Sequence, residues 1–247
     1  IAALSSAQIA ALETADVAAL TTDQMVALST AQIGAFGSAQ LAAMSRPQVE
    51  NLGVRVSGIA PTAIRGLSTQ AIVGIAGASW AGLSSAQIAG LTTTQIPAIE
   101  VGDFGAISTA AIKGLTSAQV VALTTDQVVG MTSAQAAALT TTAIAAFETV
   151  DIQALTPTHT AAFGSAQIAA LTTTQLRAVD TGDLGAVTTA AIKGLTTAQA
   201  AALTTDQVAA LTTAQVAALT VTALTSLTTA EIVALSTGQI AAMTTAQ

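Results

Sequence analysis

The sequence predicts an all-α solenoid of very short helices, each of about one and a half turns. Three observations predict it. Large apolar residues recur at every eighth position, each repeat opens with a helix-capping pair, and the charges follow the polarity of short helices. The consensus repeat is Thr-Thr-Ala-Gln-Ile-Ala-Ala-Leu, which we call an octad and number from position 1 to position 8. A fixed short period of this kind is typical of solenoids, in which each repeat packs against its neighbours.

The octads follow one another with a single change of phase. The position-8 residues begin at Leu4 and reach Leu52 in steps of eight, and a seven-residue repeat, Gly53–Ile59, then shifts the phase. Steps of eight resume after it and continue to Met243. We therefore expect one continuous solenoid over residues 1–247, with a register slip at 53–59. Within the segment Arg46–Ile59 that contains the slip, we expect a kink in preference to a contact site.

The start of each octad favours a helix. Threonine or serine at position 1 and glutamine at position 4 form a capping box: the hydroxyl accepts a backbone N–H, and the glutamine reaches back to the N–H of the capping residue. The alanines, glutamines and leucines that follow are good helix formers, and alanine is depleted in strands. Examples of the pair are Ser5 with Gln8, Thr21 with Gln24, Thr124 with Gln127 and Thr204 with Gln207.

Charges and prolines agree with this assignment. Twelve of the 13 acidic residues lie at positions 1, 3 or 4, and four of the six basic residues lie at position 6, near the end of the predicted helix. A helix dipole favours this arrangement. Pro47, Pro61 and Pro157 fall in the first turn, where no N–H is required. Pro97, at position 6, is expected to distort its octad.

Two other architectures compete with the short helices. One unbroken helix is excluded because eight residues in two turns give 4.0 residues per turn, about 0.4 more than an α-helix has, so the apolar stripe would wrap the whole cylinder. A parallel β-solenoid with two octads per coil is the alternative fold. The number of octads per coil is left open. Position 7 is nearly always alanine or glycine, which suggests that the backbone of the next coil approaches it closely.

Candidate sites are few. The single histidine, His159, is interpreted as a substituted polar residue at a helix start, because one imidazole and four methionines offer no complete metal or heme ligand set. Trp80, at position 5, is expected in the core. We expect no catalytic, cofactor-binding or metal-binding residues. Four acidic pairs are interpreted as helix caps, with weak Ca²⁺ binding left open at the two pairs that contain Gly-Asp: Glu13/Asp16, Glu100/Asp103, Glu148/Asp151 and Asp180/Asp183.

Composition excludes several function classes. The chain has no cysteine, so it can form no disulfide, zinc–cysteine site or thiol nucleophile. Its net charge of −7 makes nucleic acid an unsuitable partner. Serine, threonine or glutamine interrupts every apolar stretch, so we expect no membrane span. The sequence begins with isoleucine, so we expect any targeting signal to lie outside it or to have been removed.

The segment Leu211–Leu219, LTTAQVAAL, resembles the octad arrays of very large, repetitive bacterial surface proteins, often described as adhesins or heme utilization proteins. The resemblance implies an extracellular or cell-surface rod, and its heme label has no matching ligand pattern in these residues. We expect a structural, filament-forming segment that associates with itself laterally or end to end. The alternative is an adhesin module that recognises a glycan, a protein or ice through ladders of threonine and serine. We do not expect an enzyme.

Overall fold

The computed structural model describes residues 1–247, and helices are its only regular secondary structure. There are 27 α-helices and three 3₁₀ helices, and no strand is present. Each α-helix has four to six residues and lies within one octad, beginning at position 2 and ending at position 5, 6 or 7. The predicted all-α repeat architecture is therefore confirmed, and the β-solenoid alternative is not supported.

The chain divides into two compact units, Ile1–Gly130 and Met131–Gln247. The prediction of one solenoid over the whole chain stays a prediction. The first unit contains α1 (Ser6–Ala10), α2 (Thr14–Ala19), α3 (Thr22–Val26), α4 (Thr30–Ile33), α5 (Ser38–Ala42), α6 (Arg46–Glu50), η1 (Gly53–Gly58), η2 (Ile64–Gly66), α7 (Thr69–Val73), α8 (Gly77–Ala81), α9 (Ser85–Gly90), η3 (Ile96–Ala98), α10 (Val101–Ala106), α11 (Thr109–Ile112), α12 (Ser117–Val121) and α13 (Thr125–Val129).

The second unit contains α14 (Ser133–Ala138), α15 (Thr141–Ala146), α16 (Thr149–Ala154), α17 (Pro157–Ala161), α18 (Ser165–Ala170), α19 (Thr173–Ala178), α20 (Thr181–Ala186), α21 (Thr189–Ile192), α22 (Thr197–Ala200), α23 (Thr205–Ala210), α24 (Thr213–Ala218), α25 (Val221–Thr225), α26 (Thr229–Ala234) and α27 (Thr237–Ala241).

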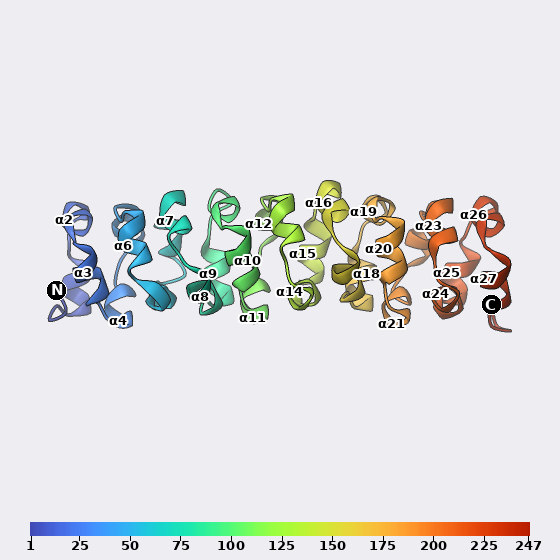
Figure 1. The fold of residues 1–247 in the computed structure, drawn as a ribbon, viewed down its shortest axis with the longest axis horizontal. Coiled ribbons are helices and arrows are strands. Elements are labelled where there is room, and N and C mark those ends of the chain that lie inside the picture. Colours follow the sequence, from blue (N-terminus) through green and yellow to red (C-terminus); the bar gives the residue numbers. More distant parts are fainter. The chain divides into compact units, whose positions relative to one another are not determined.

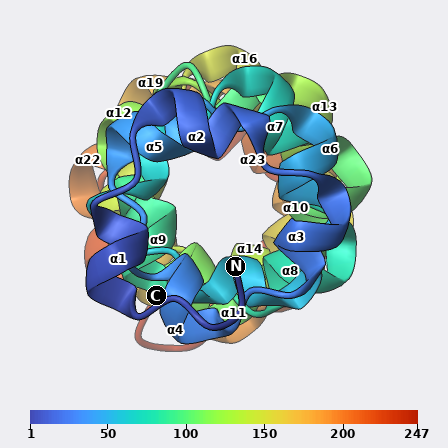
Figure 2. The same ribbon diagram turned by 90° about the vertical axis from the view of Figure 1, so that its left-hand side faces the viewer.

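In the first unit the helices circle a common axis. Figure 2 looks along that axis, and α1, α2 and α3 follow one another around the ring until α4 lies beside α1. Contacts follow the same rule, because α1 packs on α4, α2 on α5 and α3 on α6. Each helix therefore packs against the helix of the third octad after it.

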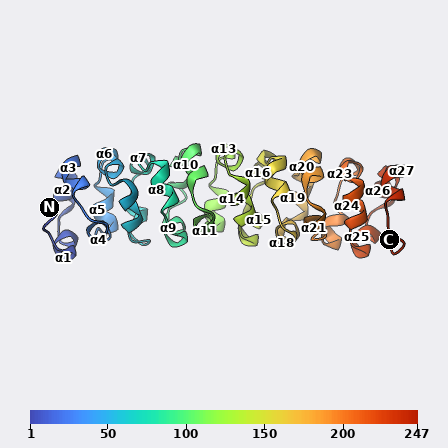
Figure 3. The same ribbon diagram turned by 60° about the horizontal axis from the view of Figure 1, so that its bottom comes forward.

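The second unit repeats this arrangement. Here α14 packs on α17, α17 on α20, α20 on α23 and α23 on α26. Figures 1 and 3 show these helices from two sides, with each coil following the one before it along the unit. The stacking rule is thus the same in both units.

The core of each unit lies inside the coil and is built from positions 5 and 8. In one octad of the second unit, Val208 is fully buried and Leu211 is 4% exposed. In the first unit, Trp80 at position 5 is fully buried and donates its indole N–H to the carbonyl of Ile75 at 2.8 Å. Trp80 is therefore a core residue, as predicted. Burial of two apolar side chains per octad explains why helices this short are stable, since isolated helices below about 12–15 residues are marginal in water.

The ends of the helices form as the capping pattern predicts. Thr204 has extended backbone angles (φ −83°, ψ 158°), and the residue after the helix, Leu211, is extended again (φ −58°, ψ 139°). The N–H of Gln207 donates to Oγ1 of Thr204 at 3.1 Å, and the N–H of Thr204 donates to Oε1 of Gln207 at 3.1 Å. Extended residues at both ends turn the chain into the next octad.

The irregular octads contain the three 3₁₀ helices. Pro97 lies in η3, where its nitrogen cannot donate to the carbonyl four residues earlier, so the predicted distortion is confirmed. In the short octad, Gly53 has φ 55° and opens η1. This left-handed conformation suits glycine. It occurs at the start of the repeat that is one residue shorter than the others. Pro157 and Pro47 lie in the first turns of α17 and α6, as predicted, whereas the octad of Pro61 forms η2.

None of the helices has the length and the apolar character that a membrane-spanning segment requires.

Candidate functional site

The glutamine at position 4 joins each coil to the one before it. In the second unit, Nε2 of Gln207 donates to the carbonyls of Leu176 and Val179, both at 2.8 Å. In the first unit, Nε2 of Gln127 donates to the carbonyls of Ile96 at 2.8 Å and Ile99 at 2.7 Å. The acceptors lie 31 and 28 residues earlier, at positions 5 and 8 of the fourth octad before. We call this arrangement the glutamine clamp.

The clamp recurs throughout both units. All of its glutamines except Gln247 have buried side chains, and Gln207 is only 2% exposed. One amide serves two partners at once: its oxygen accepts the N–H of the capping residue, and its nitrogen donates to the preceding coil. The residues that make the clamp are Gln32, Gln40, Gln48, Gln87, Gln95, Gln119 and Gln127 in the first unit, and Gln167, Gln175, Gln199, Gln207, Gln215, Gln239 and Gln247 in the second.

The clamp was not predicted from the sequence, although a signal for it exists. A capping box accepts glutamate as readily as glutamine, yet position 4 is glutamine in most octads and glutamate only at Glu231. That preference indicates a need for a hydrogen-bond donor, which a carboxylate cannot supply. The helix cap requires the amide oxygen as a hydrogen-bond acceptor, and the preceding coil requires the amide nitrogen as a hydrogen-bond donor.

Arg55 takes the place of the glutamine in the short octad. Its Nη1 donates to the carbonyls of Val26 and Leu28, the latter at 2.6 Å. Its Nε donates to the carbonyl of Leu52 at 2.9 Å, and Nη2 donates to the carbonyl of Asn51 at 2.7 Å. The longer guanidinium thus maintains the link between coils where the register slips. The slip at 53–59 is therefore an adapted octad with its own clamp.

His159 also occupies position 4 and makes the same two kinds of contact. The N–H of Thr156 donates to Nδ1 at 3.2 Å, so Nδ1 carries no proton. Nε2 then carries the proton and donates to the carbonyl of Met131, 28 residues earlier, at 2.8 Å. The ring is 2% exposed, and both of its nitrogens have partners. His159 lies in the first turn of α17, where its spacing placed it, and acts there as a substitute for glutamine.

Position 7 is the second place where coils meet closely. A Cβ built on Gly114 would lie 2.0 Å from the carbonyl oxygen of Ser85, and one built on Gly194 would lie 2.1 Å from that of Ser165. The oxygen of the earlier coil therefore occupies the space of a side chain, and the Cα hydrogens of glycine face it. The close approach predicted for position 7 is confirmed at these glycines.

The period of the coil follows from these two contacts. Position 4 lies over position 8 of an octad 28 residues earlier, as with Gln207 and Val179, and that separation is three and a half octads. Position 7 lies over position 2, as with Gly114 and Ser85. Equivalent positions are therefore staggered by half an octad from one coil to the next. The backbone of position 2 thus lies against position 7, and not against position 2, of the neighbouring coil.

Comparison with known families agrees with this geometry. The model of the ALTTAQ repeat matches residues 1–30, 25–54, 96–133, 144–181, 176–213 and 208–245, which together make up most of the chain. The chain belongs to the ALTTAQ repeat family. No curated protein matches the sequence. Residues Ala210–Gln215 have the sequence Ala-Leu-Thr-Thr-Ala-Gln. This segment contains the small residue at position 7 and the core leucine at position 8 of one octad, followed by the capping threonine at position 1 and the clamp glutamine at position 4 of the next octad.

Aspartate replaces the clamp glutamine at Asp16, Asp103, Asp151 and Asp183. Burial raises the pKa of Asp103, Asp151 and Asp183. For Asp183, burial is the largest cause and raises the pKa. The charge of Asp180 raises it further, and His159 lowers it. For Asp103, the causes are burial and then the charge of Glu100. For Asp151, burial raises the pKa, a backbone hydrogen bond from Glu148 lowers it, and the charge of Glu148 raises it. An ionised aspartate at this position has no proton to donate to the preceding coil.

The acidic pairs differ in how they cap their helices. The N–H of Glu13 donates to Oδ2 of Asp16 at 3.1 Å, and the N–H of Glu148 donates to Oδ2 of Asp151 at 3.2 Å, so these two pairs cap as predicted. The pairs that begin at Glu100 and Asp180 have no side-chain cap. No group of three or more potential metal ligands occurs, and weak Ca²⁺ binding at the Gly-Asp octads stays a prediction.

Replacing Asp183 with glutamine tests the role of position 4. The folded state holds the proton of Asp183 more tightly than the unfolded chain does, so wild-type stability should fall as the pH rises through the raised pKa. Asp183→Gln should remove this loss and add about 0.5–1.5 kcal/mol of stability at pH 7 through donation to the carbonyls of Ile152 and Leu155. Urea unfolding between pH 4 and pH 7 measures both effects. The control is Asp206→Gln at the exposed position 3, and an equal gain in both variants would contradict the prediction.

Adding a methyl group at position 7 tests the close approach. Gly114→Ala should destabilise the first unit by about 1–3 kcal/mol, because the carbonyl of Ser85 is backbone and cannot move aside alone. Gly102→Ala is the matched control. Its Cβ would have no neighbour within 4 Å, so that variant should gain about 0.5–1 kcal/mol from helix propensity. Chemical unfolding of both variants makes the comparison, and a stabilised Gly114→Ala would refute the close packing.

Proposed function

We propose that the chain is a structural segment of an extracellular or cell-surface bacterial protein, and that it acts by stacking its coils and associating with itself. The observation that carries this proposal is the repeated clamp. Position-4 side chains, such as Gln207 in the second unit and Gln127 in the first, use their polar atoms to hold one coil on another. Each added octad repeats the same contacts, so the array can be extended without any new kind of contact.

The location is supported by the resemblance of the octads to those of large bacterial surface proteins. The charge of the chain supports self-association, because only 8% of its residues are charged and neighbouring copies repel one another weakly. Exposed valines on the outside of the helices, such as Val129 (51% exposed) and Val26 (53%), offer apolar contacts for neighbours. These features suit a segment that works through length and packing.

An adhesin module is the second candidate. It is favoured by exposed hydroxyls at position 2, such as those of Thr205 and Thr213, which could contact a glycan, a protein or ice. The half-octad stagger between coils counts against it, because equivalent residues of successive coils are out of register with one another. We therefore place the structural role first.

Negative-stain images of the purified chain separate the two candidates. Ordered fibres or bundles are expected for the structural segment. Dispersed monomers that bind a glycan array, a host-protein panel or ice crystals would favour the module and overturn the structural proposal. A denatured sample of the same chain controls for binding by unfolded threonine-rich sequence.

A further inference from the structure

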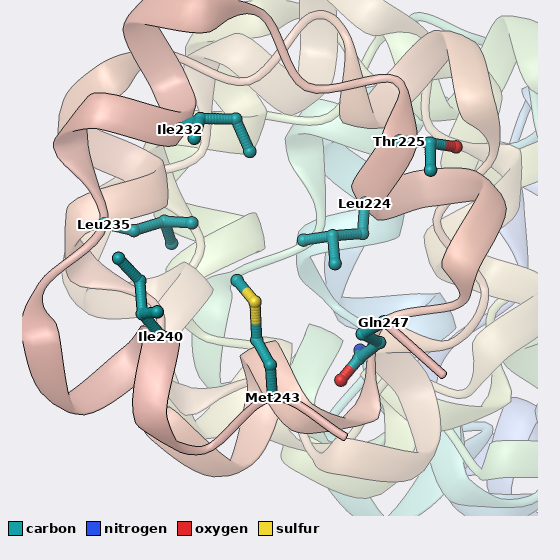
Figure 4. A pocket seen from close by; sticks show the side chains of 7 residues that line it. All are labelled: Leu224, Thr225, Ile232, Leu235, Ile240, Met243 and Gln247. Carbon is teal, nitrogen blue, oxygen red and sulfur yellow. The ribbon is translucent and has the colours of Figure 1, made fainter. Parts of the chain in front are cut away.

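The contact between α17 and α20 is the one place in the second unit where a residue of position 5 is polar. Position 5 is otherwise apolar, and Figure 4 shows leucine, isoleucine and methionine from positions 5 and 8 around a cavity of about 310 Å³. At the contact of α17 with α20, Thr160 holds position 5 and is 2% exposed. Two residues of position 4 are buried with it, His159 (2% exposed) and Asp183 (4%). Two titratable groups are therefore buried at one contact between coils.

The backbone of Asp183 is bonded to α17, but its carboxylate is not. Oγ1 of Thr160 donates to the backbone carbonyl of Asp183 at 2.8 Å. No hydrogen bond forms to the carboxylate of Asp183, and the N–H at the start of its own octad does not reach it. Asp151 differs, because its Oδ2 accepts the N–H of Glu148 at 3.2 Å. Asp183 thus lies at the clamp position without making the cap that this position makes elsewhere.

The carbonyl of Leu155 also lacks a donor. It lies 28 residues before Asp183, and in a regular octad the carbonyl at that spacing accepts from the clamp glutamine, as that of Val179 does from Gln207 at 2.8 Å. An ionised aspartate has no proton to donate, and no other group of the chain donates to the carbonyl of Leu155. One proton on Asp183 would supply the missing donor and remove a buried charge.

The equivalent contact in the first unit has a different donor. There Asp103 holds position 4 of α10, which packs on α8, and the carbonyl 28 residues earlier is that of Ile75. This carbonyl accepts the indole N–H of Trp80 at 2.8 Å, so it has a donor whatever the charge of Asp103. In the second unit Thr160 holds the position that corresponds to Trp80, and its hydroxyl bonds to the backbone of Asp183 instead. Of the two contacts, only the one in the second unit lacks a donor.

The charges around Asp183 do not supply a partner for it. Burial is the largest cause that raises its pKa, the charge of Asp180 on the same octad raises it further, and His159 on α17 lowers it. The charged residues on the other neighbouring helices are either exposed or already part of a cap: Asp151 on α16, Arg177 on α19, Lys193 on α21 and Asp206 on α23.

His159 cannot form a hydrogen bond to Asp183 while it keeps its present contacts. Its Nδ1 accepts the N–H of Thr156 at 3.2 Å, and its Nε2 donates to the carbonyl of Met131 at 2.8 Å. Both ring nitrogens are therefore engaged, and the neutral ring has no second proton. The proton that this contact requires has to be bound by Asp183 itself.

We propose that the contact between α17 and α20 is proton-dependent: it is closed when the carboxyl group of Asp183 is protonated and donates to the carbonyl of Leu155, and it loosens when Asp183 ionises. The inference goes beyond the proposed structural role and does not require self-association. The closed contact binds the proton more tightly than the open one, so it is stabilised in acid and weakens as the pH rises through the raised pKa of Asp183. The change is local, because neighbouring clamps such as those of Gln175 and Gln199 carry no titratable group.

Hydrogen exchange of the backbone amides of α17 and α20 in dilute solution tests the proposal, after correction for the intrinsic pH dependence of exchange. In the wild type, opening of both helices should increase between pH 4 and pH 7, by about tenfold for each unit by which closure raises the pKa of Asp183. Asp183→Asn carries a donor at every pH, so its opening should stay low and independent of pH. Infrared spectra provide a second readout: where exposed carboxyl groups are ionised, the C=O band of a protonated acid should lose intensity in Asp183→Asn.

Two further variants identify the titrating group. Asp103→Asn changes the equivalent residue of the first unit and should leave the pH response of α17 and α20 as in the wild type. His159→Gln should keep the response and move its midpoint to higher pH, because His159 lowers the pKa of Asp183.

The proton-dependent contact is overturned by any of three results: constant opening of the wild type from pH 4 to pH 7, the same pH response in Asp183→Asn, or loss of the response in His159→Gln. Fibres or bundles in negative stain would still support the structural role in each of these cases. Conversely, a chain that forms no fibres but shows the expected exchange would retain the proton-dependent contact and lose the structural role.

Discussion

Changing Gln207 to glutamate is expected to lower the free energy of unfolding of the second unit by about 3–5 kcal/mol at pH 7. The glutamate oxygen can still accept the N–H of Thr204. It cannot donate to the carbonyls of Leu176 and Val179, which lie 2.8 Å from the present Nε2. A carboxylate would instead be buried against two carbonyl oxygens at a site that is 2% exposed. Urea unfolding followed by circular dichroism measures the loss.

The control for this prediction is the same substitution at a glutamine that makes no clamp in the structure. Gln24 is exposed and caps its helix, but its Nε2 has no partner in the chain, so Gln24→Glu in dilute monomer should change stability by less than about 0.5 kcal/mol. The penalty in Gln207→Glu should also shrink on acidification, because a protonated carboxyl group can donate again. Equal losses in the two variants, or a loss independent of pH, would show that position 4 serves only the cap.

Several features of the fold could be predicted from the sequence because they are local. The spacing of Thr204 and Gln207 specifies where a helix starts, and the apolar residues at positions 5 and 8 specify which face is buried. Pro97 lacks an N–H, so the distortion of its octad follows from its chemistry alone. Each of these predictions depends on contacts within about one octad.

The coil period and the clamp could not be predicted in the same way. The period depends on the angle at which successive helices meet, which is set by the extended residues between them, such as Leu211 with ψ 139°. Small errors in such angles add up over a whole coil. The two carbonyls that accept from Nε2 of Gln207 lie 28 and 31 residues earlier in the chain. Which residues accept from this nitrogen therefore depends on the coil period. The sequence did place His159 at a helix start and Trp80 in the core, because their octad positions decide that.

The two ways of joining coils explain a feature of the repeat that capping alone does not. Glutamine at position 4 bridges coils through a long side chain, whereas a glycine such as Gly114 brings backbone against backbone. Several octads that carry glycine at position 7 carry alanine at position 4, as in Ala111 with Gly114 and Ala191 with Gly194. In these octads the close approach of the coils replaces the clamp.

Removing the guanidinium of Arg55 is expected to destabilise the first unit by about 2–4 kcal/mol. Arg55→Ala would leave the carbonyls of Val26, Leu28, Asn51 and Leu52 without this donor, at the octad where one residue is missing from the repeat. Chemical unfolding measures the total loss. Hydrogen exchange should show faster opening of η1 and of the coil that precedes it, because both lose the link that joins them.

Arg65→Ala is the matched control, since Arg65 is an exposed arginine at position 6 and its loss should change stability by less than about 0.5 kcal/mol. Arg55→Gln should recover part of the loss, because glutamine makes the clamp in regular octads but is too short to reach all four carbonyls. If Arg55→Ala and Arg65→Ala are equally stable, the short octad is held by its apolar contacts alone. Methionine has similar bulk to glutamine but no hydrogen-bond donor. If stability is recovered in Arg55→Gln but not in Arg55→Met, hydrogen bonding and not packing stabilises the register slip.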